Sequence, residues 1–421
     1  MPLTILTDHD VKSILHSLSR QDILDLQQSL ADALHYYSTA TEGESGCCAT
    51  YQPQRTHLKR KDGSTTLFMP ASSNDGLGVK LVTLSDPSAS NPIPPRGSIT
   101  LLDSAGFPRG MINAEEITAF RTALASTMLF KKRNNVHDLT VFGAGKQAYW
   151  HIRLALLLRP DEIHHLNIIN RSFETAKDLM KNLFDPENNK DQRVHRPDIK
   201  LITPAHTEYE RLLKSTVRSS SAIFMTTPSS KPLFPASYLT SPEGRKKGRY
   251  IAAIGSYKPH MIEIHPDILR QAVAPQHGRH FHKHAKQGGA IVVDSVEACM
   301  REAGEILQAG LEGDQVVELG ELVMLKRDAE ARRRSAAASS SSQSSLGTES
   351  SAGVQIVPDD NCPGAITGGG LDEGDLGLRD WLEKGNVIYK SVGLGLMDVV
   401  VGADLVALAD ERGVGVRIDN F

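Results

Sequence analysis

The most constraining feature of this chain is a pair of glycines and a small residue between an apolar strand and a helix, in Leu-Thr-Val-Phe-Gly143-Ala-Gly145-Lys-Gln-Ala148. Gly143 permits a tight turn, Gly145 lets a ligand approach the backbone, and Ala148 lets helix and strand pack closely. The first N–H groups of such a helix point at a bound anion. The motif therefore predicts a dinucleotide site, with a ligand-free glycine turn as the alternative. The candidate cofactor residues here are Gly143, Gly145, Lys146, Gln147 and Ala148.

Strands and helices alternate around this motif. Predicted strands lie at Leu139–Phe142, Leu166–Ile169, Lys200–Ile202, Ser221–Met225, Tyr250–Ile254 and Ala290–Val293, and predicted helices at Gln147–Leu158 and Phe173–Leu183. This alternation is typical of βαβ units and a parallel sheet. The earlier part predicts a helix at about Val11–Tyr36 and then antiparallel or mixed strands at Tyr51–Phe68, Gly78–Thr83 and Ser98–Leu102. The predicted fold class is α/β, a Rossmann-type doubly wound parallel sheet domain with a second, mixed α/β domain.

The composition is that of a soluble globular protein. Its 421 residues correspond to about two to three domains. The 47 Lys and Arg against 50 Asp and Glu argue against nucleic acid as a partner, and four cysteines are too few for a disulfide framework. No apolar stretch approaches the ~18–20 residues that span a bilayer, and the N-terminus lacks the pattern of a signal peptide. We therefore expect a cytoplasmic protein with no membrane partner.

Residues 326–376 differ in composition from the rest of the chain. They include three arginines from Arg332, a serine-rich run and Gly368-Gly369-Gly370. Such a segment cannot bury enough apolar surface to offset its ordering entropy, so we expect a disordered insertion. It is either a tolerated surface insertion or a phosphorylated or docking segment. Because residues 377–421 regain periodic apolar character, the insertion interrupts a folded unit.

The end of the second predicted strand of the dinucleotide unit indicates which cofactor binds. An NAD site usually has a carboxylate ~20 residues after the glycines, to bond the ribose 2′-hydroxyl. Here the strand is followed by Asn170-Arg171-Ser172. Arginine can pair with a 2′-phosphate, and Asn and Ser can add hydrogen bonds. We therefore favour NADP(H), with NAD(H) possible and a solvated loop arginine as the alternative.

Further motifs occur in order on both sides of the glycine loop. They are Thr66–Ala71, Gly78–Thr83, Leu102-Asp103, Ile117–Ala123, Met225–Pro228, Ala252–Gly255, Val293-Asp294, Glu302–Glu305, Tyr389–Gly393 and Asp398. With them the sequence resembles the ornithine cyclodeaminase/mu-crystallin family over nearly its whole length. The resemblance implies an oxidoreductase of amino acid metabolism with a Rossmann domain at residues 129–325. It also implies a homodimer and a substrate-binding and dimerisation domain made of residues 1–128 and 377–421.

The first domain carries three candidate substrate residues, Arg55, Lys80 and Arg121. Arginine bonds a carboxylate bidentately, and the pKa of a lysine falls when it is buried or lies beside other cations. The resemblance implies that Arg55 and Arg121 hold the substrate carboxylate and that Lys80 performs acid/base chemistry at the substrate nitrogen. For each, the alternative is a surface ion pair. On the cofactor side, Thr226, Thr227, Ile254 and Gly255 end predicted strands, where open α/β sheets place ligands.

One departure from the family pattern affects the predicted reaction. Proline-forming members have an Asp just after the motif that ends at Gly255, whereas this chain has Tyr257, which supplies no carboxylate at neutral pH. Tyr257 is therefore a substrate-binding candidate, and we favour a reductase of cyclic ketimines or imines. Two alternatives stay open. One is an NAD-assisted ornithine cyclodeaminase that forms L-proline and ammonia, and the other is a non-catalytic protein that binds a dinucleotide and a small ligand.

No metal is expected. His277, His280, His282 and His284 are clustered and could bind zinc, copper or nickel adventitiously. However, Arg279 and Lys283 add positive charge to the cluster, and hydride chemistry needs no metal.

Overall fold

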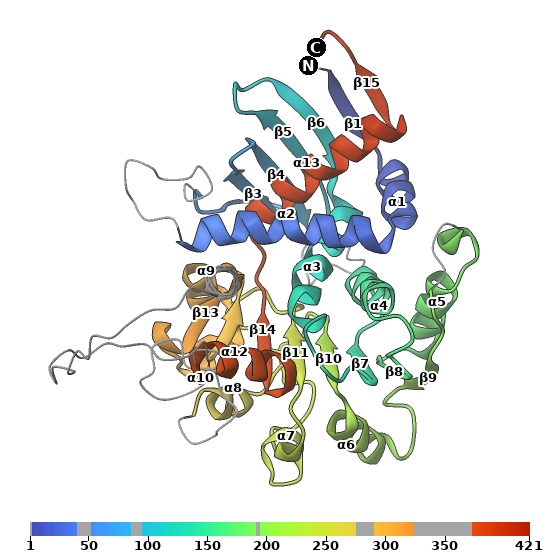
Figure 1. Cartoon of the computed structure of the whole chain (residues 1–421), viewed down its shortest axis with the longest axis vertical. Coiled ribbons are helices and arrows are strands. Elements are labelled where there is room, and N and C mark those ends of the chain that lie inside the picture. Colours follow the sequence, from blue (N-terminus) through green and yellow to red (C-terminus); the bar gives the residue numbers. More distant parts are fainter. Residues whose placement is uncertain (1, 40–51, 86–94, 191–193, 275–289, 324–372) are drawn as a thin grey trace, which may run out of the picture.

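Two β-sheets and the helices packed on them make up the computed structural model, which describes residues 2–39, 52–85, 95–190, 194–274, 290–323 and 373–421 (Figure 1). The first sheet has seven strands in the order β15-β1-β6-β5-β4-β3-β2. The strands are β1 Leu3–Leu6, β2 Thr56–Lys59, β3 Thr65–Ser72, β4 Gly76–Leu84, β5 Arg96–Asp103, β6 Pro108–Asn113 and β15 Val416–Ile418. All neighbours are antiparallel except β1 and β6. This sheet belongs to the first domain, which is therefore mixed α/β and built from both chain ends, as predicted.

Helices cover one face of this sheet. They are α1 Asp8–Ser17, α2 Arg20–Thr39, α3 Ala114–Phe130 and α13 Gly395–Arg412. Figure 1 shows α13 crossing the strands, with both chain termini beside β1 and β15. Glycines allow the close approach of α13, because a Cβ on Gly110 would lie 2.6 Å from Val406 Cγ2. Met69, Lys80 and Ile99 are buried on the same face, so the lysine of β4 lies under the helices rather than in solvent.

The predicted helix at Val11–Tyr36 is wrong in one respect, because it is two helices. Leu18 has an extended backbone and ends α1. Ser19 then caps α2: its hydroxyl accepts from the N–H of Asp22 at 3.0 Å, and the Asp22 carboxylate accepts from the N–H of Ser19 at 2.8 Å. A reciprocal cap of this kind starts a new helix even within a continuous apolar pattern. The strand predicted at Tyr51–Phe68 is likewise divided into β2 and β3.

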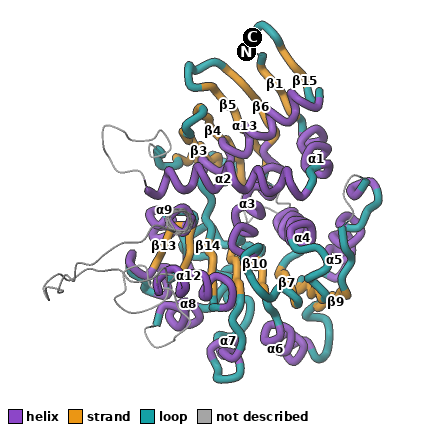
Figure 2. Tube along the Cα trace, in the orientation of Figure 1, coloured by secondary structure: helices purple, strands orange, loops and turns teal. Residues whose placement is uncertain are grey.

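The second sheet has eight parallel strands in the order β13-β12-β14-β11-β10-β7-β8-β9. The strands are β7 Asp138–Phe142, β8 His165–Ile169, β9 Asp198–Ile202, β10 Ala222–Met225, β11 Tyr250–Ala253, β12 Ile291–Val293, β13 Val316–Glu318 and β14 Val387–Lys390. Its helices are α4 Lys146–Leu158, α5 Phe173–Leu183, α6 Tyr209–Ser219, α7 Ser237–Thr240, α8 Pro266–Val273, α9 Val296–Glu302, α10 Gly304–Ala309 and α12 Glu373–Lys384 (Figure 2). The strand order reverses between β7 and β10, which is where doubly wound sheets bind ligands. The Rossmann-type prediction is confirmed.

One predicted boundary is wrong. β14 lies in the second sheet between β11 and β12, so α12 and β14 do not return to the first domain with α13 and β15. All four residues of β14 are buried, as in a central parallel strand, but a short apolar run does not reveal which sheet it joins. The expected insertion at 326–376 lies outside the described residues except at its end, where α12 already begins at Glu373.

Helix α3 joins the two units. Phe130 packs on Phe224 of β10 with ring centroids 5.5 Å apart, and the hydroxyl of Tyr250 in β11 donates to the carbonyl of Ser126 at 2.5 Å. Trp150 of α4 donates to Glu116 at 2.8 Å. These buried contacts fix α3 against the second sheet. No helix in the described ranges is both long enough and apolar enough to cross a membrane.

Candidate active site

Lys80 and Arg121 meet at the carboxylate of Asp398. The lysine lies on β4, the arginine in α3 and the aspartate in the first turn of α13. Lys80 Nζ donates to Asp398 Oδ1 at 3.0 Å, and Arg121 Nε donates to the same oxygen at 3.1 Å. The three residues are 2%, 4% and 0% exposed. The structure thus brings two of the three predicted substrate residues together in the interior.

The surroundings of Lys80 change its acidity. Burial lowers the pKa of its ammonium group to about 8. The Asp398 carboxylate opposes this shift, while the charges of Arg121 and Arg55 add to it. A lysine with such a pKa can exchange a proton near neutral pH. The other oxygen of Asp398, Oδ2, has no hydrogen-bond partner within the described part of the chain.

Arg55, the third predicted residue, lies just before β2 and reaches across to α9. Its Nε donates to Glu302 Oε1 at 3.1 Å, and a terminal nitrogen pairs with the other carboxylate oxygen. Burial lowers the pKa of Arg55, and Arg121 also lowers it. Arg55 is close enough to Tyr257 to oppose the rise that burial causes in the tyrosine pKa. The predicted substrate residues therefore lie within electrostatic range of one another.

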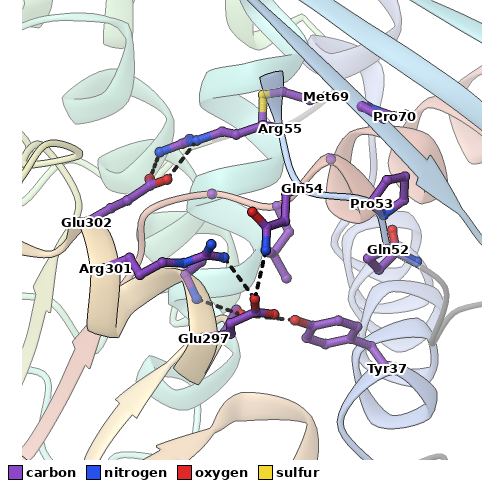
Figure 3. Close-up of a pocket in the computed structure, with 15 residues that line it drawn as sticks. Tyr37, Gln52, Pro53, Gln54, Arg55, Met69, Pro70, Glu297, Arg301 and Glu302 are labelled. Atoms are coloured by element: carbon purple, nitrogen blue, oxygen red, sulfur yellow. Dashed lines mark hydrogen bonds and ion pairs between the residues drawn. The ribbon is translucent and has the colours of Figure 1, made fainter. Parts of the chain in front are cut away.

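A pocket of about 110 Å³ opens beside Arg55 between the two units. Its lining comes from the first domain, from α9 and from the turn after β14, and includes Met69, Arg301 and Gly393. Figure 3 shows Arg55 directed toward Glu302. In the same view, Glu297 accepts from Gln54 at 3.2 Å and from Arg301 at 2.9 Å. The pocket is therefore lined by charged groups of both signs.

The glycine loop after β7 has the geometry that its sequence predicts. Gly143 has φ +106°, and a Cβ there would lie 2.7 Å from Thr226 Oγ1. Gly145 is the N-cap residue of α4 and has no side chain that could cap the helix. A Cβ at this position would meet no atom within 4 Å. Open space at the N-terminus of a helix fits a pyrophosphate. The Lys146 side chain instead pairs with Glu116 at 2.9 Å, so this residue offers the loop its backbone rather than a free ammonium group.

Asn170, Arg171 and Ser172 follow β8 and lead into α5. Ser172 is the N-cap of α5, because its hydroxyl accepts from the N–H of Thr175 at 3.3 Å. Asn170 donates from its amide to the Ser172 carbonyl at 2.8 Å. Arg171 is exposed. The asparagine and the serine therefore hold the shape of the turn, while Arg171 is open to solvent, where an anion can reach its guanidinium.

The loops after β10 and β11 lie side by side. Thr226 donates from its hydroxyl to the carbonyl of Phe142 at 2.7 Å, which ties this loop to β7. A Cβ on Gly255 would lie 2.2 Å from the Thr227 carbonyl oxygen, so only glycine fits there. Ile254 is buried. The predicted cofactor residues Gly143, Thr226, Thr227 and Gly255 thus gather at one edge of the second sheet.

Sequence reasoning gave no role to several buried charged residues. Asp294 directly follows β12 and accepts from the hydroxyl of Ser391 at 2.7 Å and from the N–H of Gly393 at 2.7 Å. Gly393 has φ +87°, and its missing Cβ leaves room for the guanidinium of Arg121, 3.0 Å from that position. Asp398 stands alone as a charge within the apolar start of α13. Both aspartates could have been recognised in the sequence, because a carboxylate that directly follows a strand, or that interrupts an apolar helix, is unusual.

The described residues contain one group that could hold a metal ion, His137, Asp138 and His165. They lie at the starts of β7 and β8, opposite the edge that carries the glycine loop. The ammonium of Lys247 lies 3.6 Å from Asp138 Oδ2, which opposes the binding of a cation. The histidine cluster at 277–284 lies outside the described residues. The expectation of no metal in the hydride site stays a prediction.

Comparisons with known proteins agree with this geometry. The sequence model of the ornithine cyclodeaminase/mu-crystallin family matches residues 16–319. Ketimine reductase mu-crystallin of Rattus norvegicus is 26% identical over 301 residues, covering 70% of this chain and 80% of that protein. A Δ1-pyrroline-2-carboxylate reductase of Bacillus cereus is 24% identical over 382 residues, covering 88% and 90%. An archaeal alanine dehydrogenase dimer with bound NAD has the same fold, with a TM-score of 0.63 at 19% identity and full coverage of both chains. The chain belongs to the ornithine cyclodeaminase/mu-crystallin family.

Proposed function

We propose that this protein reduces a cyclic imino acid or a related imine with NADP(H), by hydride transfer at the Cα–N bond. The observation that carries the proposal is that Arg55, Lys80 and Arg121 lie within electrostatic range of one another, with Arg55 lining a pocket between the two sheets. Two relatives bear the names of reductases of this class, a ketimine reductase and a Δ1-pyrroline-2-carboxylate reductase.

The three cationic side chains perform two tasks in this reaction. The bound nicotinamide supplies the hydride that reduces the C=N bond. Arg55 and Arg121 hold the substrate carboxylate, because guanidinium groups bond carboxylates in a fixed geometry and so fix Cα. Lys80 gives its proton to the substrate nitrogen, so hydride and proton together convert C=N to CH–NH. Asp398 keeps Lys80 and Arg121 at a constant separation through its shared oxygen.

The choice of NADP(H) rests on Arg171. Its exposed guanidinium follows β8, where the ribose 2′ position of a bound dinucleotide lies in this fold. A 2′-phosphate would pair with it, whereas a 2′-hydroxyl would gain little. NAD(H) remains the competing cofactor, because NAD is bound in the archaeal alanine dehydrogenase.

Ornithine cyclodeamination is the competing reaction. It needs a group that handles the side-chain amine of ornithine, and the family position for that carboxylate holds Tyr257. The absence of a carboxylate at this position favours the reductase.

We also propose that the protein is a homodimer that associates through the uncovered face of its first sheet. Exposed apolar side chains lie on this sheet at Phe68, Leu77, Met111, Val416 and Ile418. Exposed apolar side chains that share one face of a sheet are typical of an interface. The archaeal alanine dehydrogenase is likewise described as a dimer.

The test of the proposed reaction follows the absorbance of NADPH and of NADH with Δ1-pyrroline-2-carboxylate and its six-membered homologue. We expect rapid oxidation with NADPH and slower oxidation with NADH. Release of proline and ammonia from L-ornithine without net cofactor consumption would instead establish the cyclodeaminase. Dinucleotide binding with no turnover of any imino acid would favour the non-catalytic alternative.

A further inference from the structure

Glu263 is a buried carboxylate that joins two cofactor loops. It lies between β11 and α8 and is 0% exposed. Its Oε1 accepts from the N–H of Thr227 at 2.7 Å and from the Thr227 hydroxyl at 3.2 Å. Its Oε2 accepts from the N–H of Gly255 at 2.6 Å and from that of Ser256 at 3.3 Å. A single carboxylate therefore sets the spacing of the loops that follow β10 and β11.

The buried ion pair of Glu305 and Lys390 holds Glu263 in place. The Glu263 N–H donates to Glu305 Oε1 at 2.8 Å, and the Ser256 hydroxyl donates to the same oxygen. Lys390, at the end of β14, donates to the carbonyl and the hydroxyl oxygen of Ser256 at 2.6 Å each and lies 3.6 Å from Glu305 Oε2. The groups come from α10 and β14 as well as from the loop itself. The network thus links the carboxyl ends of β10, β11 and β14.

We propose that Glu263 is a positioning residue for the nicotinamide half of the bound dinucleotide, acting through the backbone of Thr227 and Gly255. The proposal rests on the proposed function only in requiring that the chain binds a nicotinamide dinucleotide. Arg171, expected at the ribose that carries the 2′-phosphate, follows β8, whereas β10 and β11 lie on the other side of β7, so the loops after them should border the nicotinamide half. Hydride transfer is sensitive to small displacements of the reacting carbon, so these loops need a fixed separation. Among the described residues, the donors to the Glu263 carboxylate are Thr227, Gly255 and Ser256 of these loops. Gly145 and Arg171, expected at the pyrophosphate and at the adenine half of the cofactor, are not among them.

The position of Glu263 between the two loops should make dinucleotide binding depend on pH. Burial raises the pKa of Glu263 to about 7, the charge of Glu305 adds to this rise, and Lys390 opposes it. Protonation places a hydrogen on one carboxylate oxygen, which can then no longer accept equally from both loops. Dinucleotide affinity should therefore fall as the pH drops through about 7.

The test compares NADPH with 2′,5′-ADP, which carries only the adenine half, by calorimetry on the full chain. In Glu263→Gln the side chain keeps one acceptor oxygen, and its NH₂ group faces an N–H of Thr227 or Gly255. We expect the NADPH Kd to rise about tenfold or more, because a buried donor is left unpaired. Binding of 2′,5′-ADP should be unchanged. Glu318→Gln, which removes a half-buried carboxylate in β13, should change neither ligand's affinity.

The outcomes separate a positioning role from a structural one. Equal weakening of both ligands in Glu263→Gln, or no weakening of either, would overturn the proposal. Between pH 6 and 8 the wild-type affinity for NADPH should change relative to that for 2′,5′-ADP, and the variant should lose this difference. A wild type without that difference would contradict the pH argument. If the wild type binds NADPH but reduces no imino acid, the proposed reaction fails while this comparison still stands.

Discussion

At the scale of single residues, Lys80 shows how burial changes chemistry. Its ordinary pKa of 10.5 is lowered to about 8, because the interior of the first domain disfavours the charged form. The same shift affects stability. Between pH 8 and 10.5 the unfolded chain binds more protons at Lys80 than the folded chain does. Burial of this lysine therefore lowers the free energy of unfolding by its full amount below pH 8, and the loss disappears as the pH rises toward 10.5.

Activity should follow the protonation of Lys80. Because the protonated form donates to the substrate nitrogen, the rate of imine reduction should fall as the pH rises through about 8. Lys80→Arg keeps the positive charge beside Asp398 but does not release a proton, so we expect a rate about 10²–10⁴-fold lower and no decline near pH 8. Steady-state rates from pH 6 to 10 provide the measurement. The control is Lys12→Arg, a half-exposed lysine of α1. A wild-type profile without a decline below pH 10 would contradict the assignment.

Part of this site could be predicted from the types of residue that its sequence motifs contain. Lys80, Arg121 and the glycines were identified because their chemistry is specific to anions and to tight turns. Asp398 received no role because it stands 318 positions from Lys80 in the sequence. Only the fold brings its Oδ1 to 3.0 Å from Lys80 Nζ. Glu263 gave no signal at all, since it stands in an irregular loop between two isoleucines.

At the scale of elements, the β7–turn–α4 unit was predicted from sequence almost residue for residue, whereas the position of β14 was not. A glycine pattern determines its own local geometry, but the neighbours of a short apolar strand depend on the whole sheet. The predicted single N-terminal helix was wrong because a cap formed by Ser19 and Asp22 divides it.

The two glycines of this unit should respond differently to alanine. In Gly143→Ala the Cβ meets Thr226 Oγ1 and the backbone keeps a positive φ, so we expect a loss of about 1–3 kcal/mol in unfolding free energy together with weaker dinucleotide binding. In Gly145→Ala the Cβ enters open space, so stability should be unchanged while the affinity for NADPH falls. Thermal denaturation and calorimetry measure the two effects. Unchanged NADPH affinity in Gly145→Ala would show that the open space at Gly145 is not a ligand site.

At the scale of the whole molecule, the first sheet has one face under helices and one face without a partner in the chain's described residues. The uncovered face continues across the strands in register, with Val79 opposite Thr100, Thr100 opposite Met111 and Met111 opposite Ile5. The sequence predicted antiparallel or mixed strands here, but the register of the sheet and its exposed side emerge only when distant strands are assembled.

This face provides a test of the oligomeric state. Leu77→Glu and Met111→Glu place charges on it, and we expect either variant to convert a wild-type dimer to monomers in size-exclusion chromatography with light scattering. Leu307→Glu, which alters an exposed leucine on α10, should leave the dimer intact. A monomeric wild type would rule out the proposed homodimer.

Hydride transfer to Cα with a proton from Lys80 is tested most directly by isotope transfer. The protein is incubated with NADPH deuterated at C4 on the transferred face and with a cyclic imino acid, and the product is analysed by mass spectrometry. We expect one deuterium at Cα of the cyclic amino acid, and a product that is lost in Lys80→Met. Product without deuterium, or undiminished turnover in Lys80→Met, would contradict the proposed reaction.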